Sequence, residues 1–216
     1  MSSSEDGLTK PHLAHHFETI EKQDYAVRLG MWLFLGTEVL LFAGLFLGYT
    51  VYRHFYYEAF HEASRHLALW AGTTNTIVLI TSSLSVALAY HAIKQNKKKQ
   101  CAALLIFTIL CAVAFLCIKA FEYREKFQEG ALPGAYYHFA EVTAPGANLY
   151  YTIYFLSTGL HAFHVIVGMS ILIWILARVL KGEFSATNYV PVEMGGLYWH
   201  LVDLVWIFLF PLLYLI

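Results

Sequence analysis

Charged residues are scarce in this chain: 13% of its 216 residues are Asp, Glu, Lys or Arg, against about a quarter in an average soluble domain. Hydrophobic residues make up 58%. This composition excludes an ordinary soluble globular fold and predicts an integral membrane protein. The formal net charge of -1 leaves no excess of basic residues of the kind that nucleic acid requires, so no nucleic-acid partner is expected.

Cysteine and proline are also rare. The three cysteines, Cys101, Cys111 and Cys117, lie in or beside one apolar run. Their spacing predicts neither a disulfide set nor a metal site, and we interpret them as inert thiols. Pro211 is the only proline inside an apolar run. The first 27 residues lack the apolar segment of a secretory signal peptide, so residues 1–27 are expected to form a polar cytoplasmic tail.

Five apolar runs are long enough to cross a hydrocarbon core of about 30 Å, which needs roughly 20 helical residues. We expect a five-helix transmembrane domain over 28–216, with spans at about 29–52, 70–92, 101–120, 149–180 and 196–216. None of the runs alternates in polarity as membrane β-strands do. The predicted fold class is therefore an all-α membrane bundle.

The orientation follows from the positive-inside rule. Lys and Arg are more frequent in the tail and in the connections after the second and fourth runs, and the strongest cluster is Lys97–Lys99. The N-terminus is therefore expected inside and the C-terminus outside.

Five of the ionisable side chains inside the runs are candidate functional residues, because a charge in the bilayer costs at least about 2.5 kcal/mol. Glu38 is expected near mid-depth, and His161 and His164 share one helical face because they are three residues apart. His164 is expected at a depth similar to that of Glu38, so a contact between them is conceivable. His200 and Asp203 also share a face and are expected near the inner end of their run. All five are candidates for lipid contact or proton handling, with hydrogen bonding between helices as the alternative.

Metal binding by these histidines is not expected. A di-metal bundle site needs Glu-x-x-His units on two helices, and the runs offer no such pair. A bis-histidine haem needs imidazoles at one level, whereas His164 and His200 are expected at different depths.

A further set of residues is expected to serve close helix packing. Gly44 and Gly48 form a small-x3-small stripe, and the hydroxyl-rich second run is predicted to be a central helix. Glu122, at the outer end of the third run, is expected to pair locally with Lys119 or Lys126. The full set of packing candidates is Gly44, Gly48, Asn75, Ser82, Ser83, Trp199 and Trp206.

Several of these segments resemble subunit III of the haem-copper terminal oxidases. The motifs fall in order on four of the five runs: Gly30–Leu35 with Glu38 and 42–46, Asn75–Thr76 with 81–83, Thr158–His161 with His164 and Gly168, and Glu193 with Tyr198–His200 and Asp203–Trp206. Glu38 stands where the family has a carbodiimide-reactive glutamate. Long members have seven helices, and this chain lacks the first two, as the short bacterial forms do. In the long form those two helices form one arm of a lipid-holding cleft.

The resemblance implies a bacterial plasma-membrane subunit that carries no redox centre of its own. It implies contact with catalytic subunit I, with subunit II and with a small subunit IV, so that haem and copper lie in partner subunits. It also implies bound phospholipids, support for proton uptake and protection of the catalytic subunit during reduction of oxygen to water.

Three alternatives remain open at this point. A subunit of a quinol oxidase of the same superfamily would have the same helix plan, and the chain cannot distinguish it because the electron donor binds elsewhere. A related membrane protein that accompanies nitric-oxide reductase would share the helix plan with a different enzyme. A small-solute or proton transporter would belong to another class, and it predicts symmetrically interrupted helices that the runs do not contain.

Overall fold

The computed structural model describes residues 13–15 and 17–216. The regular secondary structure of that part is helical, apart from one isolated bridge between Ser185 and Asn188. The elements are α1 (Ile20–Phe55), α2 (Tyr57–Arg65), α3 (Leu69–Lys94), α4 (Lys98–Glu129), the 3-10 turn η1 (Gly134–Tyr136), α5 (Ala147–Leu180) and α6 (Val190–Tyr214). Five of them, α1, α3, α4, α5 and α6, are long and apolar enough to cross a membrane. The predicted all-α membrane bundle is confirmed for the described residues.

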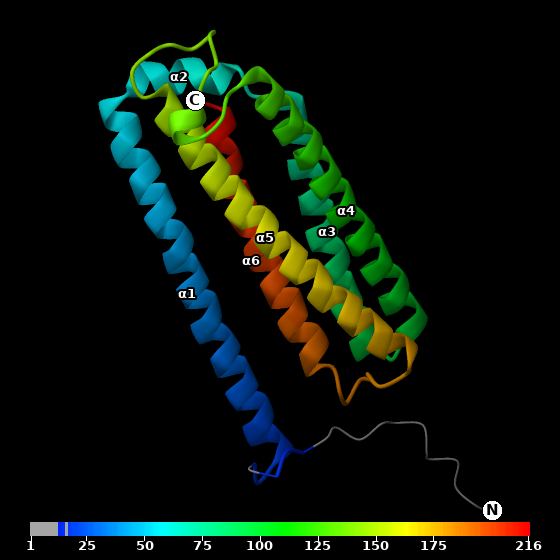
Figure 1. Cartoon of the computed structure of the whole chain (residues 1–216). Helices are drawn as coiled ribbons and strands as arrows, with labels where there is room; N and C mark the ends of the chain where they lie inside the picture. Colours follow the sequence, from blue (N-terminus) through cyan, green and yellow to red (C-terminus); the bar gives the residue numbers. More distant parts are fainter. Residues whose placement is uncertain (1–12, 16) are drawn as a thin grey trace, which may run out of the picture.

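The helices α3 to α6 form one tightly packed bundle, and α1 stands beside it (Figure 1). The most extensive contacts join α3 with α4 and α6, and α5 with α4 and α6. Helix α1 meets only α5 and α6 among the long helices, over a much smaller area, and α2 lies across one end of the molecule (Figure 1). We call this end the α2 end. The start of α1 and the end of α6 lie at opposite ends of the bundle (Figure 1).

The helices extend beyond the apolar runs that predicted them. Helix α1 begins at Ile20, where the Thr19 side chain accepts a hydrogen bond from the Lys22 backbone N–H at 3.3 Å. The last part of the predicted polar tail, residues 20–27, is therefore helical, while its residues 1–12 and 16 lie outside the described part. Helix α4 continues to Glu129 and ends at Gly130, whose φ of 78° is left-handed. Hydropathy locates the membrane-crossing part of a helix and not its polar ends.

The early start of α6 changes the depth of two candidate residues. The helix begins at Val190 with Pro191 in its first turn, instead of near residue 196. At 1.5 Å per residue, His200 and Asp203 therefore lie about 15 and 20 Å along α6 from its first residue. The expectation that they lie near the inner end of the last helix is wrong, because α6 begins at Val190 although Pro191 and Glu193 interrupt the apolar pattern there.

Glycine permits close helix contact in this bundle, but not at the predicted stripe. A Cβ at Gly168 would lie 2.9 Å from Trp199 Cε3, and one at Gly195 would lie 2.4 Å from Ile175 Cδ1. Among the described residues, nothing lies within 4 Å of a Cβ at Gly44 or Gly48. Within this chain the stripe on α1 therefore packs against no helix, and its role in packing stays a prediction about lipid or a partner subunit.

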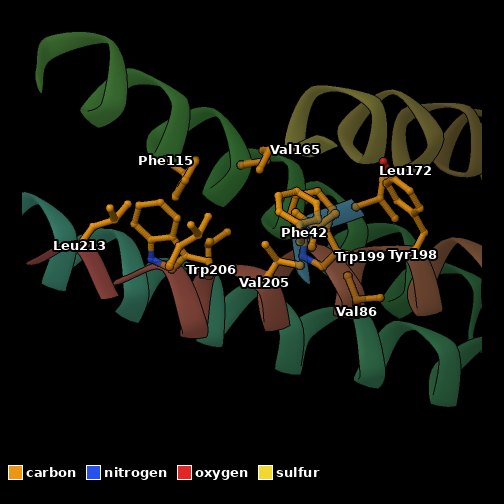
Figure 2. Packing of buried hydrophobic residues seen from close by; sticks show 14 of the residues in the cluster. Phe42, Val86, Phe115, Val165, Leu172, Tyr198, Trp199, Val205, Trp206 and Leu213 are labelled. Atoms are coloured by element: carbon orange, nitrogen blue, oxygen red, sulfur yellow. The ribbon is translucent and has the colours of Figure 1, made fainter. Parts of the chain in front are cut away.

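The core of the bundle is aromatic and aliphatic, with the two indoles of α6 at its centre. Trp199 and Trp206 are fully buried. Figure 2 shows Phe115 and Trp206 packed together, with Trp199 further along α6 among Val86, Val165 and Val205. The Phe115 and Trp206 ring centroids lie 4.9 Å apart in an edge-to-face arrangement. This rigid core positions the polar side chains described next.

Candidate functional site

The contact between Glu38 and His164 links α1 to the bundle. Glu38 Oε2 lies 2.8 Å from His164 Nε2, and the two side chains are 15% and 9% exposed. The other ring nitrogen, Nδ1, lies 2.8 Å from the Leu160 carbonyl oxygen. A carbonyl can only accept, so Nδ1 carries a hydrogen, and one proton remains to be shared between Nε2 and the Glu38 carboxyl group. The pair is therefore either a neutral acid with imidazole or a carboxylate with imidazolium.

Two further contacts hold His164 in place. The Phe42 ring meets the imidazole edge-on, with centroids 5.2 Å apart. The Tyr198 hydroxyl donates to the His164 carbonyl oxygen at 3.4 Å. The pair is thus enclosed by side chains from α1, α5 and α6. Glu38 and His164, which were expected at similar depths, are in direct contact.

A cleft of about 560 Å³ opens between α1 and the α5–α6 face, at the end of the molecule away from α2. Its walls are mostly apolar and include Met31, Phe34, Val167 and Trp174. Phe34 lies one turn before Glu38, and Tyr198 also lines the cleft, so the cleft reaches toward the Glu38–His164 pair.

The mouth of the cleft is polar. Asp24 and Arg178 line it, and the Arg178 guanidinium lies over the Trp174 ring at 4.5 Å while Nη1 is 3.2 Å from Glu183 Oε2. Beside the cleft, Arg28 Nη2 donates to Glu193 Oε2 at 2.9 Å and ties the start of α1 to α6. An apolar cleft with a cation at its mouth has the chemistry of a phospholipid site, because an acyl chain and a phosphate need these two environments.

Polar bonds join α3 to α6 at three points. Trp199 Nε1 donates to Ser82 Oγ at 3.0 Å, and Trp206 Nε1 donates to Thr76 Oγ1 at 3.0 Å. His200 Nδ1 lies 2.8 Å from Ser83 Oγ. Two packing candidates, Ser82 and Trp199, thus bond to each other, whereas Trp206 bonds to Thr76 and Ser83 to His200. Helix α3 is a central helix with contacts to both α4 and α6.

The remaining sequence candidates are buried in the same bundle but lack such bonds. Asn75 and His161 are 0% exposed and Asp203 is 3% exposed. Among the described residues, none of their side-chain nitrogen and oxygen atoms has a hydrogen-bond partner. His161, on α5, packs against both the Phe115 and the Trp206 ring, at centroid distances of 5.5 and 5.2 Å. The structure therefore does not bring His161 and His164 to one common partner, although they share a helix face.

A buried network around Lys119 is larger than the sequence suggested. Lys119 Nζ donates to Glu122 Oε2 at 3.0 Å, which is the expected local pair. It also donates to the hydroxyls of Tyr154 at 3.1 Å and Tyr214 at 2.8 Å. Both phenols in turn donate to Glu122 Oε1, at 2.7 and 2.5 Å. The tyrosines lie on α5 and α6, so no spacing along the chain could have linked them to Lys119.

In residues 13–15 and 17–216, no group of three or more His, Cys, Asp or Glu side chains is arranged to hold a metal ion. The three cysteines are free thiols, and Cys101 is fully buried in α4.

Comparison with known proteins identifies the family. Residues 67–216, which span α3 to α6, match the family model described as cytochrome c oxidase subunit III. The chain belongs to the cytochrome c oxidase subunit III family. Cytochrome c oxidase subunit 3 of Hippopotamus amphibius and that of Pongo abelii are each 31% identical over 212 residues, and that of Gallus gallus is 29% identical. Each match covers 93% of this chain and 72% of the relative. Subunits of this family are parts of an oxidoreductase complex, which agrees with the five apolar helices described above.

Proposed function

We propose that this chain is a subunit III that supports the catalytic subunit of a cytochrome c oxidase during the reduction of oxygen to water. In this proposal it contacts subunit I, together with subunit II and a small subunit IV, and the haem and copper belong to those partners. It lies in a bacterial plasma membrane with its N-terminus inside. The basic residues Lys97–Lys99, Arg178 and Lys181 at the end away from α2 support this orientation.

The observation that carries the proposal is the cleft between α1 and the α5–α6 face. Its apolar walls suit an acyl chain, and Arg178 at its mouth can bind a phosphate through its guanidinium. Asp24, on the α1 side of the mouth, can accept hydrogen bonds from a headgroup amine or hydroxyl. The proposed role of the cleft is to hold a phospholipid between α1 and the bundle.

Proton handling is assigned to the Glu38–His164 pair. A pair that shares one proton can take up a second proton by creating a single positive charge on the imidazole, because the carboxyl oxygen then accepts a hydrogen bond from the charged Nε2–H. A carboxyl group alone at this depth would pay the full cost of burying a charge. The pair is therefore suited to support proton uptake by a neighbouring catalytic subunit.

The outer face of α1 is the proposed contact with lipid and with subunit I. It carries large apolar side chains that are more than half exposed, among them Trp32, Leu33, Leu40 and Leu47. The unpartnered Gly44 and Gly48 lie on the same helix and would let another helix approach closely.

The direct test is isolation of the intact complex through a tag placed ahead of α1. The proposal predicts that a haem-copper catalytic subunit and tightly held phospholipid come with the chain in mild detergent. A stable monomer that carries no haem-containing partner and moves solutes in liposomes would overturn it.

A further inference from the structure

A second groove lies between α3 and α4, at the end of the molecule away from α2, and its volume is about 520 Å³. Figure 1 shows α3 and α4 side by side at this end, where the short turn between Lys94 and Lys98 joins them. No residue that lines this groove also lines the cleft beside α1. The two are therefore separate sites.

The groove is apolar along the helices and polar at the turn. Leu88 and Ala92 on α3 face Ala103 and Leu104 on α4, within two helices that are apolar enough to cross a membrane. Leu88 lies six residues before the end of α3, so the apolar part reaches about 9 Å along the helix. The polar part is formed by His91, Gln95, Lys97 and Gln100. The groove thus runs from the depth of lipid headgroups into the hydrocarbon.

The polar end of the groove carries an excess of positive charge. Lys97 lines it, and none of the described residues that line it is Asp or Glu. Lys98 and Lys99 follow directly in the sequence. Within residues 13–15 and 17–216, no ion pair involves Lys97 or Lys99. These two ammonium groups therefore remain available to an anion.

The neighbouring lysines are engaged within the chain. The Lys94 amine lies over the rings of Tyr90 and Tyr189, at 5.2 and 5.3 Å from their centroids. Lys98 Nζ donates to the Gly182 carbonyl oxygen at 3.0 Å. These contacts tie the turn to the segment before α6, so the turn that carries Lys97 is held in place.

The opposite end of the same helix pair has the opposite charge balance. A groove of about 370 Å³ lies there between α3 and α4, and Arg124 lines it together with Glu122 and Glu125. The two carboxyl groups outnumber the one cation. The excess of positive charge is therefore specific to the groove at the Lys97 end.

We propose that the groove between α3 and α4 binds an anionic phospholipid of the leaflet at the Lys97 end, with its phosphate at Lys97 and an acyl chain along Leu88 and Ala103. Basic pockets between transmembrane helices on the cytoplasmic side typically bind anionic headgroups. Lysine binds phosphate as a point charge, and the Gln100 amide can donate a further hydrogen bond. A zwitterionic lipid would bring an ammonium group for which the described lining offers no carboxylate. The site differs from the cleft in its helices and in its preference for an anionic headgroup, so it goes beyond the proposed function.

Cross-linking in the intact complex tests the site. The probe is phosphatidylglycerol with a photoreactive diazirine in one acyl chain, added to the delipidated complex, and peptide mass spectrometry locates the cross-links. We expect cross-links in this chain around Leu88 and Ala103. Unlabelled phosphatidylglycerol should displace the probe at an about fivefold lower concentration than phosphatidylcholine with the same acyl chains. This ratio corresponds to about 1 kcal/mol for one basic residue near an anionic headgroup.

Three variants separate headgroup recognition from acyl-chain binding. Lys97→Gln should abolish the preference for phosphatidylglycerol. Lys99→Gln removes the same charge two residues further on, outside the groove lining, and is the matched control that should keep most of the preference. Ala103→Phe fills the apolar part from an exposed position, so it should reduce cross-linking near Leu88 with the charge unchanged.

Four results would overturn the proposal. Equal displacement by the two lipids would mean an apolar groove without headgroup selectivity, and an unchanged preference in Lys97→Gln would remove Lys97 from the site. Displacement by glycerol 1-phosphate as effective as that by phosphatidylglycerol would mean a site for free phosphate. Absence of cross-links on both α3 and α4 in the assembled complex would mean that a partner subunit covers the groove.

Discussion

Glu38 Oε2 and His164 Nε2 lie 2.8 Å apart, although 126 residues separate them along the chain. This contact and the Arg28–Glu193 ion pair are two polar ties between α1 and the rest of the bundle. Because α1 packs less extensively than the other long helices, these ties help to hold it against α5 and α6, and so help to shape the cleft between them.

Replacing His164 tests the shared proton directly. His164→Leu leaves the Glu38 carboxyl group without its partner, and an unpaired group of this kind costs about 1–3 kcal/mol. Glu38→Gln should cost less, because an amide N–H can donate to a neutral imidazole. The midpoints of thermal unfolding compare the two variants, and an equal loss in both would contradict the single-proton arrangement.

Lys119 and Glu122 are predicted to stabilise the bundle only as a pair. Lys119→Met leaves Glu122 buried among Tyr154 and Tyr214 without its cation, and breaking such a pair typically costs about 3–5 kcal/mol. The double variant Lys119→Met with Glu122→Gln should recover most of this loss, because no uncompensated charge remains. Thermal unfolding of the unchanged protein, both single variants and the double variant forms a double-mutant cycle. Strictly additive stability losses would argue against coupling between the two residues.

The two indole bonds between α3 and α6 offer a matched comparison. Trp206→Phe and Trp199→Phe each remove an N–H donor at 3.0 Å from a hydroxyl of α3. Each loss should cost about 1 kcal/mol plus the cavity left by the smaller ring. Trp206→Phe should also weaken the packing of His161, which lies against that indole, so its effect is predicted to be the larger. Equal unfolding midpoints would contradict this ranking.

Two glycines should respond in opposite directions to alanine. Gly168→Ala places a Cβ 2.9 Å from Trp199 Cε3 and should cost about 1–3 kcal/mol through overpacking. Gly44→Ala meets no atom within 4 Å and replaces a mid-helix glycine, which should stabilise the isolated helix by about 0.5–1 kcal/mol. If Gly44→Ala instead loosens the assembled complex, then a partner helix packs on that face.

The cleft predicts a lipid phenotype. Arg178→Gln removes the cation at the cleft mouth, so less phospholipid should remain with the purified complex. Lys181→Gln, three residues further on and not part of the cleft lining, is the matched control. Mass spectrometry of retained lipid measures both, and an unchanged lipid content in Arg178→Gln would remove Arg178 from the proposed site.

The sequence was sufficient to predict the fold class and the five membrane-crossing helices, because long apolar runs have few alternatives in a bilayer. It did not predict the ends of α1 and α4, since polar helical turns outside hydrocarbon leave no hydropathy signal, nor the start of α6, where Pro191 and Glu193 interrupt the apolar pattern. For this reason Asp203 was placed near a helix end instead of about 20 Å along α6.

The candidate site was only partly predictable, for a related reason. Depth counting indicated that Glu38 and His164 could meet, and the Lys119–Glu122 pair followed from spacing within one helix. The links that join different helices, such as Tyr154 and Tyr214 to Glu122, depend on how the helices rotate against one another. Likewise, the Gly44–Gly48 pattern signals close packing, but it does not say whether the neighbouring helix belongs to the same chain.

Glu38→Ala in the assembled oxidase tests the central claim, which is that the Glu38–His164 pair supports the catalytic subunit without contributing to its redox centres. Haem spectra and the number of turnovers before inactivation are measured on the same preparation. The account predicts unchanged haem spectra and a shorter active lifetime. Loss of haem from the complex, or a lifetime equal to that of the unchanged protein, would contradict it.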